Sequence, residues 1–103
     1  MGPRRRRVTW SEGARRELDE AIAYVAEDSP RNAVALLERL LDAGASLAQL
    51  SERGRIVPER GESNIREVQV EPYRLIYSVE DDGVTVLGIL HGRRDFDRWE
   101  RPI

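Results

Sequence analysis

Apolar side chains recur at helical spacing through the first half of the chain. From Ser11 to Glu27 they fall four, three, one and three residues apart, at Ala14, Leu18, Ala21, Ile22 and Val25. This spacing places them on one face of a helix. Ser11 is a suitable N-cap, because its hydroxyl can accept from the first unpaired backbone N–H groups. The pattern therefore predicts a first amphipathic helix that ends near Glu27.

A second helix is predicted to begin at Ser29 and Pro30. Serine is a good N-cap, and proline is favoured at the first helical position, where its missing N–H costs nothing. The apolar pattern continues to about Leu50, with expected inward positions at Val34, Leu37, Leu40, Leu41, Leu47 and Ala48. Because the link between the two helices is short, we expect them to form an antiparallel hairpin.

Branched and aromatic residues indicate strands outside the helices. Val8 and Trp10 alternate with polar neighbours and predict a short N-terminal strand. Three later runs predict an antiparallel meander: Ile65–Val70, Tyr73–Val79 and Val84–His91. The last two runs are joined by Asp82-Gly83, a dipeptide typical of two-residue hairpin turns.

The elements together predict an α+β fold in one domain that spans residues 1–103. The expected order is an N-terminal strand, the helical hairpin and then the three-stranded meander. The helices should cover one face of the small sheet. Ser51–Asn64 is rich in charge and contains Gly54, Pro58 and Gly61, so it is expected to be a loop, with Ile56 and Val57 as its anchor.

Strand alternation gives the hairpin Tyr73–His91 two different faces. A two-residue turn would pair Val79 with Val86 and Arg74 with His91. The face assigned to the helices is almost wholly apolar: Tyr73, Leu75, Tyr77, Val79, Val84, Val86, Gly88 and Leu90. The other face has an apolar centre and a charged rim: Arg74, Ile76, Ser78, Thr85, Leu87, Ile89, His91 and Arg93. Glu67 and Gln69 join this second face if the preceding turn keeps an even register.

The second face is the candidate functional surface, because an apolar patch rimmed by charge is typical of a protein-binding site. Its predicted partner-binding residues are Arg74, Ile76, Leu87, Ile89, His91, Arg93 and Arg94. In an alternative interpretation, the C-terminal tail with Phe96 and Trp99 covers the apolar centre. Arg74 opposite His91 also suggests anion binding or acid–base chemistry, since histidine titrates near neutral pH.

The composition narrows the classes of function. The 103 residues include no Cys and one His, so disulfides, thiolate metal sites and His clusters are excluded, and no metal or cofactor is expected. No apolar run approaches the ~20 residues that span a bilayer, so no membrane partner is expected. No apolar segment follows the N-terminal arginines as it would in a secretion signal. A cytoplasmic protein is the default expectation.

The charge balance argues against a general nucleic-acid binder. Nineteen acidic residues face seventeen basic ones, all of them Arg, for a net charge of −2. Affinity for nucleic acid depends largely on neutralising phosphates. The run from Arg4 to Arg7 is a local exception. It is either an arm that binds a nucleic acid or a partner, or a solvated end before an edge strand, where charge blocks unwanted pairing.

The chain resembles the RelE/ParE toxin family over essentially its whole length. The resemblance is carried by REV at 66–68, YRLIY at 73–77, VLGILHGRRD at 86–95 and the helix start at 11–14. It implies a toxin of a type II toxin–antitoxin pair. Such a toxin is expected to form a hetero-oligomer with an antitoxin protein, whose extended or helical tail wraps the toxin and covers its working surface.

The two branches of the family imply different targets. The ribonuclease branch cuts messenger RNA on the ribosome, with lysines on the strand before the hairpin and arginines at positions like Arg74 and Arg94. Here that strand carries Glu67 and Gln69, and the chain has no Lys. The LHGRRD ending is more similar to the ParE branch, whose target is DNA gyrase, so we expect a gyrase inhibitor without catalytic residues. The alternatives are a ribosome-dependent mRNA endonuclease that uses Arg74, His91 and Arg94, and an inactive family member that acts only as a binding module.

Overall fold

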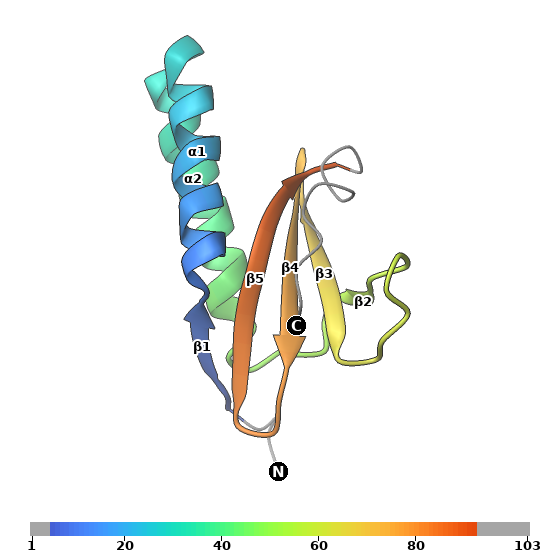
Figure 1. Ribbon diagram of the computed structural model, residues 1–103. Coiled ribbons are helices and arrows are strands. Elements are labelled where there is room, and N and C mark those ends of the chain that lie inside the picture. The colour runs from blue at the N-terminus through green and yellow to red at the C-terminus, as the bar shows by residue number, and fades with distance from the viewer. Residues whose placement is uncertain (1–4, 93–103) are drawn as a thin grey trace.

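The computed structural model of the protein describes residues 5–92, which form two layers. Two helices cover one face of a five-stranded sheet (Figure 1). In chain order the elements are β1 (Arg7–Trp10), α1 (Glu12–Asp28), α2 (Pro30–Ser46), β2 (Arg55–Ile56), β3 (Ile65–Val70), β4 (Tyr73–Val79) and β5 (Gly83–His91). The α+β fold expected from the sequence is confirmed.

The sheet has the strand order β1-β5-β4-β3-β2 and is mixed. The expected meander of β3, β4 and β5 is antiparallel, and β2 adds an antiparallel edge strand from within the segment that was expected to be a loop. β1 pairs parallel with β5 and forms the other edge. The chain reaches this parallel pairing by running through both helices and the meander between the two strands, as parallel neighbours require a long connection.

The helical hairpin follows the predicted caps. The Ser11 hydroxyl accepts from the N–H of Ala14 at 3.0 Å, and the Ser29 hydroxyl accepts from the N–H of Asn32 at 3.1 Å. The closed end of the hairpin projects past the sheet (Figure 1). The second helix ends at Ser46, which is earlier than the predicted end near Leu50.

The buried face of α2 differs in part from the expected one. Its buried residues are Ala33, Leu36, Leu40 and Gly44. Val34 and Leu41, which we expected to face inward, are 58% and 45% exposed. Gly44 lets the helix approach β1 closely, since a Cβ added there would lie 2.9 Å from the Trp10 ring. The apolar residues of α2 therefore form two stripes, of which only one is buried.

Each face of the sheet has its own apolar cluster. On the helix side, both helices pack on residues from β3, β4 and β5: Val68, Val70, Tyr73, Leu75, Tyr77, Val84, Val86 and Ile89. On the opposite side, Val57 of the connecting segment packs on Ile65, Ile76 and Leu90, with Leu87 against the same cluster. Val57 is therefore the anchor that the sequence suggested, whereas Ile56 is 41% exposed and is not.

A register shift in the β4–β5 pair changes which side chains share a face. Tyr77 pairs with Val86 and Ile76 pairs with Gly88, which leaves Leu87 as the extra residue of a bulge. The predicted pairings of Val79 with Val86 and Arg74 with His91 are wrong. Val79 instead pairs with Val84, and Arg74 pairs with Leu90. Beyond the bulge every side chain of β5 lies on the face opposite to the predicted one.

Glu17 of α1 and Ser11, the N-cap of this helix, satisfy backbone groups at the bulge. The N–H of Ile89 donates to Oε1 of Glu17 at 3.1 Å, and the Ser11 hydroxyl donates to the carbonyl oxygen of Leu87 at 3.4 Å. A bulge removes backbone groups from the regular ladder, so these groups need other partners when they are buried. The first helix, α1, thus stabilises the bulge of β5, the strand on which it packs.

Candidate functional site

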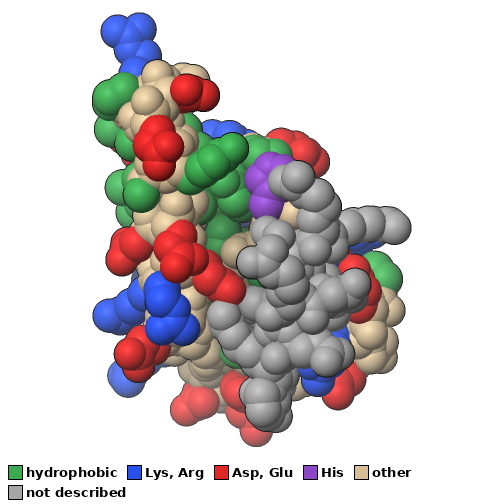
Figure 2. All heavy atoms as spheres, turned by 45° about the horizontal axis from the view of Figure 1, so that its top comes forward, with side chains coloured by type: hydrophobic (Ala, Val, Ile, Leu, Met, Phe, Trp, Pro, Cys, Tyr) green, Lys and Arg blue, Asp and Glu red, His purple; other side chains and the backbone are tan. Residues whose placement is uncertain are grey.

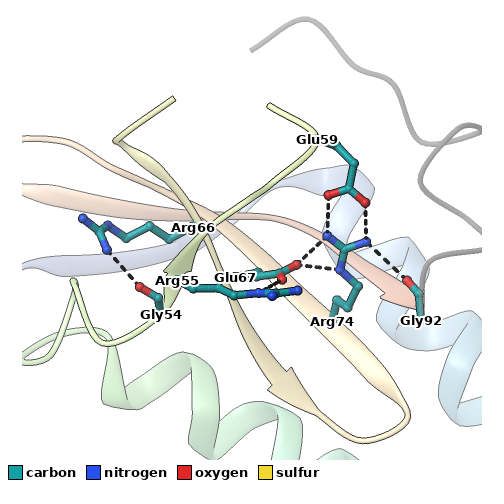
Figure 3. Close-up of polar contacts among 7 residues, drawn as sticks. All are labelled: Gly54, Arg55, Glu59, Arg66, Glu67, Arg74 and Gly92. Carbon is teal, nitrogen blue, oxygen red and sulfur yellow. Dashed lines mark hydrogen bonds and ion pairs between the residues drawn. The ribbon is translucent and has the colours of Figure 1, made fainter. Parts of the chain in front are cut away.

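Arg74 lies at the centre of a buried ion-pair cluster on the sheet face opposite the helices (Figure 3). Its side chain is only 3% exposed, and that of Glu67 on β3 is fully buried. One oxygen of Glu67 lies 2.5 Å from both Nε and Nη2 of Arg74. Gln69 is the Cα partner of Arg74, which confirms the even register that placed Glu67 and Gln69 on this face.

The segment between α2 and β3 adds a second carboxylate to the cluster. Glu59 accepts two hydrogen bonds from Arg74, at 3.0 Å from Nη2 and 3.1 Å from Nη1 (Figure 3). This bidentate geometry matches the planar donor fork of an arginine. Nη1 also lies 3.5 Å from the carbonyl oxygen of Gly92, and Arg55 of β2 donates to the other oxygen of Glu67. The guanidinium of Arg74 is therefore occupied by the chain itself.

Opposing effects act on the pKa of Arg74. Burial lowers it, because a charged group loses its hydration. The hydrogen bonds and charges of Glu59 and Glu67 outweigh this effect and leave the pKa of Arg74 raised. The cluster therefore keeps the arginine charged and neutralises that charge locally. The expectation that Arg74 forms part of an exposed rim is wrong.

His91 lies on the other face of the sheet. It is the Cα partner of Tyr73, whose side chain belongs to the helix-side cluster. The two rings make an edge-on contact with centroids 5.2 Å apart and an interplanar angle of 89°. Figure 2 shows the purple histidine at the surface beside hydrophobic side chains. The bulge at Leu87 thus separates His91 from Arg74, and the expected pairing of these two residues on one face is not formed.

The remaining predicted site residues are dispersed. Ile76 is fully buried under Val57, Leu87 is half-buried on the same face, and Ile89 is buried on the helix side. Arg93 and Arg94 lie outside the described residues, as do Phe96 and Trp99. The apolar centre expected as a docking surface is therefore covered in part by the 51–64 segment.

Glu59 and Arg55 were not predicted from the sequence as partners of the cluster. Both lie in the charged segment that was expected to be a loop, and their charge carried no signal about a particular partner. A groove between α2 and β1 was also not predicted. This groove has a volume of about 660 Å³ and is lined by Arg5, Arg6, Arg7, Val8, Trp10, Leu41, Ala45 and Ala48. The one available signal was the second apolar stripe of α2.

The described part of the chain gives no sign of two other kinds of site. Within residues 5–92, neither helix combines the length and apolar character that crossing a membrane requires. The same residues contain no group of three or more His, Asp or Glu side chains placed to hold a metal ion.

The fold is shared with a solved toxin–antitoxin structure. The chain superposes with a TM-score of 0.70 on a structure described as "Chromosomal ParDE TA system from P. aeruginosa", at 20% identity, covering 85% of this chain and 97% of that chain. At this identity the likeness shows the fold alone. The two chains therefore share the same small α+β architecture.

Sequence comparison gives the family. The family model described as "ParE toxin of type II toxin-antitoxin system, parDE" matches residues 8–96. The chain is 35% identical over 88 residues to Toxin RelE2 of Caulobacter vibrioides, covering 84% of this chain and 96% of the relative. It is 32% identical over 93 residues to Y4kP of Sinorhizobium fredii, covering 89% and 94%. The chain belongs to the ParE toxin family, within the RelE/ParE group that the sequence resembles.

Proposed function

We propose that this toxin arrests growth by inhibiting DNA gyrase through protein–protein binding, and that a cognate antitoxin protein neutralises it. Both interactions would take place in the cytoplasm. The family match to ParE toxins supports the proposal. One observation favours this proposal over a nuclease: the guanidinium of Arg74 is already engaged by Glu59 and Glu67.

The cluster around Arg74 is unfavourable for RNA cleavage. A nuclease needs a cation that is accessible to the phosphate and stabilises the charge that develops there. Here two carboxylates surround the arginine, and they would repel a phosphate at the same place. His91 lies on the opposite face of the sheet from Arg74. These placements support a toxin that acts by docking rather than by chemistry of its own.

A supercoiling assay tests the gyrase proposal. Purified toxin added to gyrase, relaxed plasmid and ATP is expected to block supercoiling or to accumulate cleaved DNA. Prior mixing with the antitoxin is expected to remove the effect, which serves as the control for specific inhibition. Unchanged supercoiling at excess toxin would contradict the proposal.

The second candidate is a ribosome-dependent mRNA endonuclease. It is favoured by the 35% identity to a relative named Toxin RelE2. Messages translated in the presence of toxin would then be cut in the ribosomal A site, and Arg74→Ala would abolish the cuts. If the toxin neither cuts messages nor slows growth when it is expressed without antitoxin, the chain is an inactive binding module, the third interpretation.

A further inference from the structure

Residues 57–63, between β2 and β3, form a strap at the edge of the sheet (Figure 1). Its turn is stabilised from within. The N–H groups of Arg60 and Gly61 both donate to the carbonyl oxygen of Val57, at 3.1 and 2.9 Å, and Arg60 pairs with Glu62 at 3.2 Å. Gly61 has a φ of 68°, which glycine adopts without strain. Because these contacts lie inside the strap, it can keep them when it moves as a unit.

Two side chains attach the strap to the sheet face opposite the helices. Val57 is fully buried and packs on Ile76 and Leu90. Two positions later, Glu59 accepts hydrogen bonds from both Nη atoms of Arg74, at 3.0 and 3.1 Å (Figure 3). The strap therefore covers the apolar centre of this face with an apolar side chain and covers its arginine with a carboxylate.

The two carboxylates that contact Arg74 differ in how they are held. Glu67 belongs to β3 in the regular sheet, and its side chain is fully buried. Glu59 belongs to the strap, and its side chain is 32% exposed. Local opening favours segments with few buried contacts over strands of the core. Glu59 is therefore the carboxylate that can leave while Glu67 stays.

The charges of the cluster indicate what the opened face would accept. With the strap closed, two arginines, Arg55 and Arg74, balance the two carboxylates. Departure of Glu59 leaves one net positive charge among the remaining three side chains, beside the apolar Ile76. The planar donor fork of an arginine matches a single carboxylate. Glu67 remains in place and disfavours a polyanion such as RNA.

We propose that the strap is an autoinhibitory segment, and that the target protein displaces it with an extended segment of the same chemistry, an apolar side chain followed two positions later by a carboxylate. The carboxylate replaces Glu59 on Arg74, and the apolar side chain replaces Val57 on Ile76 and Leu90. The proposal rests on the proposed function in that the toxin docks on a protein, but not on gyrase being that protein. The closed strap lowers the apparent affinity for the target, because only the open fraction of the toxin can bind.

Opening of the strap is measured by hydrogen exchange at the Val57 amide, which donates to the carbonyl oxygen of Ile65 at 3.0 Å. Glu59→Gln keeps the shape of the side chain and removes the charge that attracts Arg74. Exchange at Val57 is therefore expected to become at least about tenfold faster. Glu62→Gln is the matched control, since Glu62 pairs within the strap, and it should change the rate less than about threefold. Equal rates in the two variants would overturn the role of Glu59.

Docking is measured as the toxin concentration that halves gyrase supercoiling. Glu59→Gln is expected to lower this concentration by about the factor by which it speeds exchange at Val57, because both quantities follow the open fraction. Val57→Ala weakens the other attachment and is expected to act in the same direction, whereas Glu62→Gln should act like the unmodified toxin. Circular dichroism confirms folding. Unchanged or reduced potency in a folded variant whose strap opens faster would overturn the proposal.

A synthetic peptide tests the chemistry of the docking segment. The probe has the sequence of residues 55–60, RIVPER, and the control peptide has glutamine in place of its glutamate. Added to Glu59→Gln toxin, the probe is expected to shift the NMR signals of Arg74 Nε and of the Ile76 methyl groups. The control peptide should need at least about threefold more for half-saturation, because it lacks the charge-assisted hydrogen bonds. Equal binding of the two peptides, or no shift with either, would overturn the proposal.

Growth and translation assays separate the target from other occupants. Glu59→Gln toxin is expected to arrest growth at lower expression than the unmodified toxin and to leave translated messages intact. Cleavage of messages by this variant would assign the uncovered Arg74 to phosphate. Tighter antitoxin binding with unchanged growth arrest would assign the face to the antitoxin, and either result would overturn the proposal. A toxin without effect on gyrase would refute the proposed target alone, since the exchange rates, peptide shifts and growth arrest still decide the role of the strap.

Discussion

Glu67 and Arg74 lie on neighbouring strands, and one carboxylate oxygen of Glu67 is 2.5 Å from two nitrogens of the Arg74 guanidinium. Both side chains are buried, so neither charge is hydrated as it would be at the surface. Removing one partner of a buried pair leaves the other charge uncompensated, which costs more than the pair itself contributes. The buried ion pair with Glu67 therefore gives Arg74 a structural role in this toxin.

The first prediction concerns this buried pair. Glu67→Gln is expected to lower the free energy of unfolding by about 1–3 kcal/mol, because Arg74 keeps its charge, loses its fully buried counterion and retains only Glu59, which is partly exposed. Glu62→Gln is the matched control: Glu62 pairs with Arg60 at 3.2 Å, but its side chain is 49% exposed. The control is expected to cost at most about 1 kcal/mol. Urea denaturation of both variants measures the difference, and equal losses would contradict the assigned role of burial.

The second prediction concerns the bulge. Glu17→Ala removes the acceptor of the Ile89 N–H and is expected to cost about 1–3 kcal/mol, since this amide is left without its partner next to a buried side chain. Hydrogen exchange at the Ile89 amide should accelerate. Glu20→Ala, at an exposed position of the same helix, is the control and should leave that amide unchanged. An Ile89 amide that stays protected in Glu17→Ala would show that the bulge does not depend on α1.

The third prediction concerns Gly54, next to β2. A Cβ at this position would lie 2.4 Å from the carbonyl oxygen of Glu67 and 2.7 Å from the hydroxyl of Tyr77. Gly54→Ala is therefore expected to cost about 3 kcal/mol, because the backbone of β3 cannot move aside easily. Gly83→Ala is the control, since its Cβ would meet only the Arg7 carbonyl oxygen at 3.6 Å. Thermal unfolding compares the two, and a Gly54→Ala protein as stable as Gly83→Ala would disprove the close contact.

The fourth prediction concerns pH. Burial raises the pKa of Tyr77 above its ordinary value, although the hydrogen bond from the Gly54 N–H acts in the opposite direction. The unfolded chain then loses this proton first, at about pH 10. The stability due to Tyr77 is complete below pH 10 and falls as pH rises from there toward the folded pKa. In Tyr77→Phe, unfolding measured from pH 8 to 11 should show a shallower decline, and an equally steep decline would assign it to other groups.

Local sequence information was sufficient to predict both helices and the strands of the meander. The strands Ile65–Val70 and Tyr73–Val79 have the predicted bounds, and both helices begin at their predicted serine caps. These features depend on neighbours within a few residues, such as a cap hydroxyl three residues from its donor. The helix-facing set of β4 was also correct, because alternation along a regular strand is a local property.

The sequence by itself determined the two helices, the meander and the side of the sheet that each regular strand turns toward the helices. Only the tertiary structure decided the bulge at Leu87, the carboxylates around Arg74 and the groove beside Trp10. Each of these depends on groups distant in the chain: Glu17 lies seventy-two residues before Ile89, and Glu59 reaches Arg74 from a segment without a local pattern. One extra residue in a strand moves every later side chain to the opposite face of the sheet. The sequence around Leu87 carries no local signal for this residue, because the bulge is supported by α1, which is distant in the chain.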